Sequence, residues 1–152
     1  METITIKPHH FMDIIKLYGA GIENFVPDKK LGHDFYRIGN LVLACHTQPL
    51  LLTIEGDDIC TLCRQYRGLC QDALANIPGF TGKNEYNRAL DSRILSLYGL
   101  SAGPYPAEEL CGILYQGRKK IFQVWQEEEN ALTQRRFDLF TAGAEKYLGS
   151  YK

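Results

Sequence analysis

The stretch Leu50–Ile54, LLLTI, is the strongest strand signal in the chain, and the turn residues Glu55–Asp58, EGDD, follow it directly. Short apolar runs that end at turn residues are typical of buried strands. Thr3–Ile6, TITI, alternates polar and apolar residues and predicts a second, shorter strand. If these two segments pair, the chain contains a small β-sheet.

Helical periodicity accounts for most of the remaining sequence. Pro8 suits the first turn of a helix, and apolar residues at helical spacing continue from it to Gly19. Further helices are predicted at about 31–45 and 84–98 and, after the Gly103–Pro106 turn, through the rest of the chain. We therefore expect residues 1–152 to form a single α+β domain, predominantly helical, with a small β-sheet from short strands near 3–6 and 50–55 and a helical C-terminal part from about residue 106.

The composition is that of an ordinary soluble globular protein: 152 residues, 45% hydrophobic, 23% charged and a formal net charge of −1. A net charge this small provides no general attraction to nucleic acid or to an anionic membrane. The apolar runs are too short to cross a bilayer, and the N-terminus lacks the pattern of a secretory signal. We expect a cytoplasmic protein with no nucleic-acid or membrane partner.

Three cysteines, Cys60, Cys63 and Cys70, form a C-x2-C-x6-C pattern just after the predicted main strand. The two-residue gap lets a pair of sulfur atoms turn toward one ion, at about 2.3 Å in a zinc site. Iron–sulfur clusters use the same gap and usually take four thiolates. In a reducing compartment such cysteines are more often thiols or metal ligands than disulfides. The pattern predicts a metal centre with three sulfur ligands and a fourth ligand from elsewhere.

The start of the first helix offers three candidates for the fourth ligand: His10, which we prefer, and His9 and Asp13 as alternatives. Adjacent helical residues point about 100° apart, so one histidine would bind while the other contacts a supporting partner. Asp13 could instead orient an imidazole. His33 and His46 are expected to be structural or exposed. The other cysteines that could supply a ligand are Cys45 and Cys111.

Two other interpretations of the three cysteines stay open. They could be buried small residues without a metal, because free cysteine is among the most buried residue types. They could also form a thiol–disulfide redox site, because strand, turn, C-x2-C and helix is the local order in thioredoxin-like proteins. The surrounding sequence, however, lacks a repeated βαβ pattern, so metal binding is favoured.

Three stretches and a single cysteine resemble one protein family: Ile4–Asp13 (ITIKPHHFMD), Gly56–Cys63 (GDDICTLC), Cys70 and Leu90–Leu95 (LDSRIL). The family is domain of unknown function 1284, whose members are described as iron–sulfur-binding proteins, and the resemblance covers roughly residues 3–115. It implies that Cys60, Cys63 and Cys70 hold an iron–sulfur cluster. The first cysteine of the family falls on Asp13 here, which removes the all-thiolate ligand set. Completion by a carboxylate or an imidazole would suit iron and also zinc.

Asp91 matches another recurrent position of the same family. We expect it to be a charge on a helix surface, paired with Arg88 or Arg93. The alternative is a carboxylate that supports the metal site from behind a ligand.

The predicted function is metal binding, with an electron-transfer or sensing role and a redox partner protein. One alternative is a metalloenzyme whose metal keeps an open coordination position; the sequence identifies no catalytic residue for it. Another is an interaction module, or a homodimer, formed by the long C-terminal helices around Trp125 and Phe137.

Overall fold

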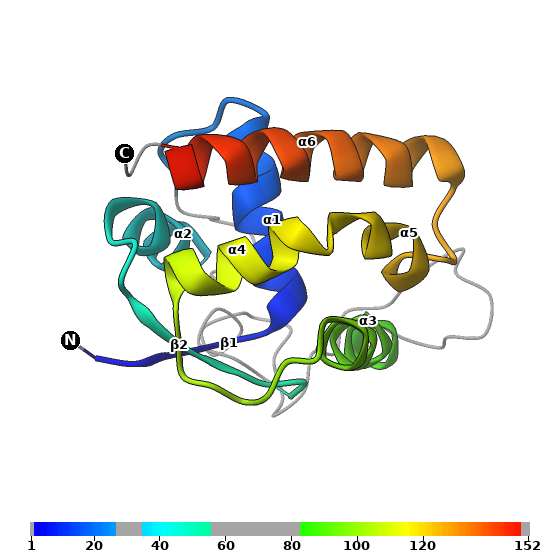
Figure 1. Cartoon of the computed structure of the whole chain (residues 1–152), viewed down its shortest axis with the longest axis horizontal. Helices are drawn as coiled ribbons and strands as arrows, with labels where there is room; N and C mark the ends of the chain where they lie inside the picture. Colours follow the sequence, from blue (N-terminus) through cyan, green and yellow to red (C-terminus); the bar gives the residue numbers. More distant parts are fainter. Residues whose placement is uncertain (1, 27–34, 56–82, 150–152) are drawn as a thin grey trace.

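The structure, a computed structural model, describes residues 2–26, 35–55 and 83–149 (Figure 1). These ranges form a predominantly helical α+β domain with a small mixed sheet, which confirms the predicted fold class. None of the helices in these ranges is long and apolar enough to cross a membrane. In chain order the elements are β1 (Ile4–Ile6), α1 (Pro8–Gly19), α2 (Phe35–Ala44), β2 (Pro49–Leu52), α3 (Lys83–Tyr98), β3 (Tyr105–Pro106), α4 (Ala107–Gln116), the 3-10 helix η1 (Arg118–Lys120), α5 (Ile121–Val124) and α6 (Asn130–Gly149).

The sheet has the order β1-β2-β3. β1 and β2 run parallel, with Ile4 opposite Leu50, so the predicted pairing of these two strands is confirmed. β2 begins at Pro49 and ends at Leu52, whereas the apolar run predicted a strand reaching residue 54 or 55. Proline is tolerated at the first residue of a strand. β3 is antiparallel to β2 and only two residues long, which is too short for a periodic signal.

α1 occupies the centre of the molecule, and α6 crosses it (Figure 1). Ile14 and Ile15 of α1 are fully buried. The two helices meet at glycines: a Cβ atom on Gly19 would collide with the carbonyl oxygen of Leu139, and one on Gly143 with that of Ile15. The absence of side chains at these two positions lets the helix backbones touch.

Because β1 and β2 run parallel, the segments that follow these strands begin at the same end of the sheet. α1 starts directly after β1, and the chain leaves β2 at the same end, where the Thr53 N–H donates to the Ile6 carbonyl at 3.2 Å. α3 packs against α1. An ion pair of 3.0 Å between Glu55 and Arg88 joins the chain after β2 to α3. The start of α1, the end of β2 and α3 therefore lie together.

Candidate functional site

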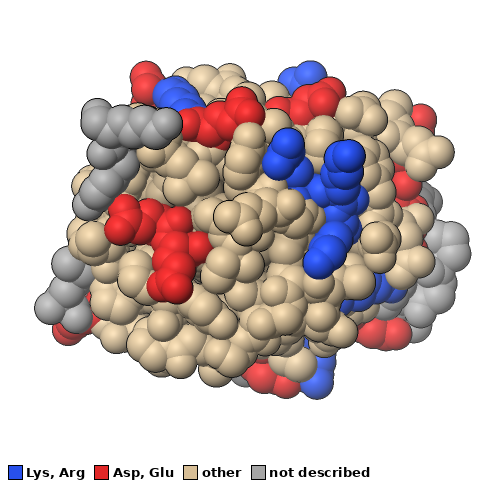
Figure 2. Space-filling view, in the orientation of Figure 1, with Lys and Arg blue, Asp and Glu red and all other residues tan. Residues whose placement is uncertain are grey.

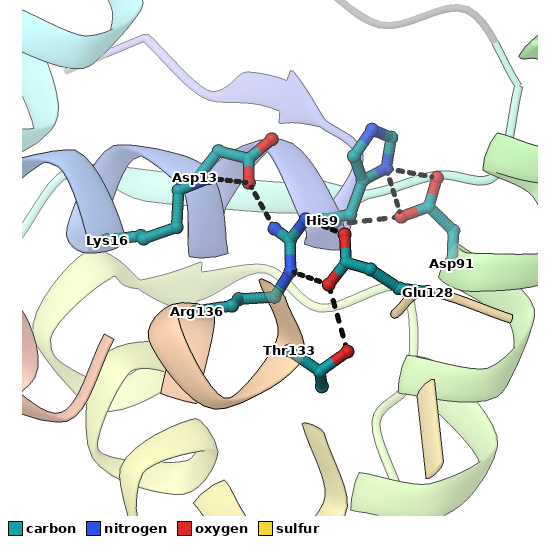
Figure 3. Close-up of polar contacts among 7 residues, drawn as sticks. All are labelled: His9, Asp13, Lys16, Asp91, Glu128, Thr133 and Arg136. Atoms are coloured by element: carbon teal, nitrogen blue, oxygen red, sulfur yellow. Dashed lines mark hydrogen bonds and ion pairs between the residues drawn. The ribbon is translucent and has the colours of Figure 1, made fainter. Parts of the chain in front are cut away.

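A histidine–carboxylate pair connects the first turn of α1 to α3 (Figure 3). Nδ1 of His9 lies 2.9 Å from Oδ1 and 3.0 Å from Oδ2 of Asp91. The backbone N–H of His9 also donates to Oδ1 of Asp91, at 2.9 Å. Asp91 thus accepts hydrogen bonds from both the side chain and the backbone of His9. These bonds lie at the N-terminal end of α1, where the helix dipole favours a negative charge.

Both members of this pair are removed from water. The exposed fraction is 0% for Asp91 and 7% for His9. Burial on its own lowers the pKa of His9, but the charge of Asp91 and its hydrogen bond outweigh burial and raise that pKa above its ordinary value. A buried carboxylate is costly without such partners, so the pair depends on both residues.

The contact with Asp91 fixes the direction of the imidazole. Nδ1 of His9 faces the carboxylate, and the other ring nitrogen, Nε2, points away from Asp91 (Figure 3). Metal-binding histidines commonly have this arrangement, in which a carboxylate holds one nitrogen and orients the other toward the ion. The same arrangement serves histidines that accept or donate protons.

His10 is half-buried and lies beside His9, with ring centroids 4.4 Å apart and ring planes inclined by 47°. The structure therefore brings together two of the residues that the sequence proposed as the fourth ligand. His9 is oriented by a fully buried carboxylate, that of Asp91.

Asp13, the third candidate, belongs to a different group of charges. Its Oδ1 lies 3.1 Å from Nη1 of Arg136 and 3.7 Å from Nζ of Lys16 (Figure 3). Arg136 also contacts Glu128 at 2.8 Å and stacks over the Trp125 ring at 4.2 Å. These contacts tie α1 to α6 and favour a structural role for Asp13.

The predicted cysteine ligands Cys60, Cys63 and Cys70, together with His33, lie outside the described residues. Within the described ranges, no group of three or more histidine, cysteine or acidic side chains could hold a metal on its own.

The remaining candidate ligands lie in ordinary packing environments. Cys111 is buried on α4, where burial raises the pKa of its thiol to about 12 and so disfavours the thiolate that a metal needs. Cys45 is half-buried, with its sulfur 3.6 Å from the Thr47 hydroxyl. His46 stacks on Tyr147 with ring centroids 3.8 Å apart, in line with the structural role predicted for it.

The expectation that Asp91 is a surface charge paired with Arg88 or Arg93 is wrong. Asp91 is fully buried, Arg88 pairs with Glu55, and Arg93 makes a two-bond contact with Glu127 at 2.7 and 2.6 Å. The position of Asp91 in the sequence nevertheless indicates that this residue is buried. Asn87, Asp91 and Ile94 follow one another at helical spacing, and the structure buries all three on the inner face of α3.

No family model matches this chain, and no curated protein or solved structure matches it either. The resemblance to domain of unknown function 1284 stays a prediction.

Proposed function

We propose that this protein binds a metal centre, an iron–sulfur cluster or a zinc ion, through Cys60, Cys63, Cys70 and His9. The observation that carries the proposal is the buried carboxylate of Asp91 on Nδ1 of His9. A carboxylate at one ring nitrogen is the usual support of a histidine that binds metal through the other. His9 therefore replaces His10 as the preferred fourth ligand.

The described residues on either side of the cysteine segment support this ligand set. Glu55 comes just before that segment and Lys83 opens the helix that follows it. Glu55 is joined to α3 by its ion pair with Arg88, and α3 delivers Asp91 to His9. The chain leaves the described residues two positions after Thr53, which bonds to the Ile6 carbonyl just before α1, and returns at the start of α3, eight positions before Asp91.

The chemistry of the set fits both kinds of centre. Three thiolates and one imidazole form a Cys3His group, which is a common ligand set of structural zinc. Iron–sulfur centres also accept histidine in place of cysteine, which raises their reduction potential. The family resemblance supports the cluster, and the replacement of the family's first cysteine by Asp13 supports zinc.

Four protein ligands leave no open coordination position on zinc, which favours a structural or sensing role over catalysis. An electron-transfer role requires the iron–sulfur cluster, because zinc has no redox chemistry. The proposal includes a cytoplasmic location, because free thiols persist in a reducing compartment. It also includes a redox partner protein for a cluster that carries electrons, and no nucleic-acid partner.

Purification without oxygen, followed by metal and sulfide analysis and a visible absorption spectrum, tests the proposal. Equal amounts of iron and sulfide with visible absorption would identify a cluster, and stoichiometric zinc would exclude it. Cys63→Ser should lose the metal, whereas the matched variant Cys45→Ser should keep it. Metal content unchanged in Cys63→Ser would contradict the ligand set.

The fourth ligand needs a separate comparison between neighbouring histidines. His9→Ala should lower metal content or affinity, and His10→Ala should leave both close to the native values. Asp91→Asn should weaken metal binding by about 10- to 100-fold, the usual effect of removing a carboxylate behind a ligand. The opposite ranking of the two histidine variants would assign the ligand to His10.

A further inference from the structure

Gly112 lies in the middle of α4, where a glycine weakens the helix relative to alanine. The helical glycines Gly39 and Gly143 have an evident reason, because a Cβ atom would collide with the Phe25 ring and with the Ile15 carbonyl respectively. A Cβ atom on Gly112 would meet nothing within 4 Å in the part of the chain that the structure describes. Packing within this part of the molecule therefore does not account for Gly112.

The outer face of α4 carries Gly112 together with Glu109, Ile113 and Gln116, which share one side of the helix at three- and four-residue spacing. Glu109 and Gln116 are exposed, and Gly112 and Ile113 are partly exposed. The opposite face is fully buried and consists of Ala107, Leu110, Cys111 and Leu114.

Charges of opposite sign flank this outer face. Glu108 and Glu109 lie in the first turn of α4, and η1, with the sequence Arg118–Lys120, follows its last turn. Figure 2 shows an acidic group and a basic group on the same face of the molecule, with uncharged surface between them. Lys119 is exposed, whereas Lys120 is half-buried and donates to the Leu97 carbonyl at 2.7 Å.

We propose that α4 is a self-association surface, on which α4 of a second copy packs antiparallel across a two-fold axis near Gly112 and Ile113. A two-fold axis places the same patch on both sides, so the patch must complement itself. Antiparallel pairing brings the acidic first turn of α4 in each copy toward the last turn of α4 and the basic η1 of the other, whereas a parallel arrangement would oppose like charges. The bare backbone at Gly112 lets the two helices approach closely, as Gly19 and Gly143 do where α1 crosses α6.

This arrangement selects a second copy as the partner, because the acidic and basic ends of one face match each other in reverse order. A single pair of helices buries less surface than a standard interface, so we expect a dimer that dissociates in the micromolar range. The proposal depends only on α4 and η1 and is independent of metal binding.

Sedimentation equilibrium of the full chain across the micromolar range tests the proposal. The native protein should show a monomer–dimer equilibrium that weakens with added salt. Gly112→Leu should be monomeric, with a native circular dichroism spectrum and a thermal midpoint at low protein concentration no lower than that of the native protein. Glu109→Lys and Lys119→Glu should each weaken the dimer by about tenfold, because a symmetric dimer contains each changed pair twice.

The charge-reversal variants remain informative even if Gly112→Leu does not fold. Combining Glu109→Lys with Lys119→Glu should restore dimerisation, since the paired charges are opposite again. Asp138→Lys, a reversal at an exposed position on α6, should leave the equilibrium unchanged. A native protein that stays monomeric throughout the range would overturn the proposal, as would a dimer that survives the single reversals.

Discussion

Nδ1 of His9 lies 2.9 Å from Oδ1 of Asp91, whose side chain is completely excluded from solvent. Asp91 accepts a further hydrogen bond from the backbone of His9, so one carboxylate satisfies two donors at the start of α1. The pair therefore joins α1 to α3 and at the same time sets the direction of the imidazole. A structural role of Asp91 predicts that replacing this residue lowers stability even without metal, whereas a role in supporting a metal ligand predicts weaker metal binding.

Asp91→Ala should lower the free energy of unfolding by about 3 kcal/mol, because breaking a buried ion pair leaves its partner desolvated and alone. Urea denaturation of metal-depleted protein would measure this cost apart from any effect of a ligand. The exposed acid Asp138 provides the matched control, and Asp138→Ala should change stability by no more than about 0.5 kcal/mol. Equal effects of the two substitutions would mean that the His9–Asp91 pair contributes little to folding.

Local periodicity predicted the elements of this fold well. The helix expected at residues 84–98 corresponds to α3 at Lys83–Tyr98, and the two expected strands pair as proposed. These features depend on patterns within a few turns of chain, which a single sequence displays directly.

The site was harder to predict, because its geometry joins distant parts of the chain. His9 and Asp91 are 82 positions apart, and no local pattern specifies that they touch. Because charged residues are mostly exposed, the sequence alone predicts that Asp91 lies on the helix surface. The helix crossing at Gly19 and Gly143 escaped prediction for the same reason.

The crossing of α1 and α6 predicts opposite effects of one substitution at two glycines. Gly143→Ala should destabilise the protein by about 2 kcal/mol, because the added methyl group forces the two helix backbones apart. Gly112→Ala should raise the stability of the monomer by up to about 1 kcal/mol, since alanine favours the helix and the site is open. Thermal unfolding at low protein concentration measures both changes. If Gly143→Ala were as stable as the native protein, the close packing of the two helices would be disproved.

Burial of Cys111 predicts a loss of stability in alkaline solution. The pKa of this thiol rises from its ordinary value of 9.0 to about 12 in the folded protein, so above pH 9 the unfolded chain releases a proton that the folded chain keeps. The contribution of Cys111 to the unfolding free energy is therefore constant below pH 9. It falls by about 1.4 kcal/mol per pH unit between pH 9 and pH 12.

Removal of the thiol tests this assignment. The stability of Cys111→Ala relative to the native protein should improve progressively above pH 9, because the variant has no thiol at this position to titrate. Denaturant titrations of the two proteins at a series of pH values would measure this difference. A pH-independent difference for Cys111→Ala would show that the thiol titrates equally in both states.

Asp13 provides the last prediction, because its contacts give it a structural role and the sequence made it a candidate metal ligand. Asp13→Asn should keep the native metal content. It should lower stability by about 1 kcal/mol, the scale of a partly exposed ion pair, because Asp13 is the acid through which Arg136 contacts α1. Arg136→Ala should cost more, about 2 kcal/mol, since it also removes the contact with Glu128 and the stacking on Trp125.

Trp125 fluorescence separates the two variants further, because the guanidinium of Arg136 lies against its ring. The emission should shift in Arg136→Ala and stay near its native position in Asp13→Asn. Arg136→Lys should recover only part of the lost stability, since an ammonium group cannot make the two-bond contact with Glu128. Loss of metal from Asp13→Asn with little change in stability would instead place this carboxylate in the metal centre, at the position where the resembling family has its first cysteine.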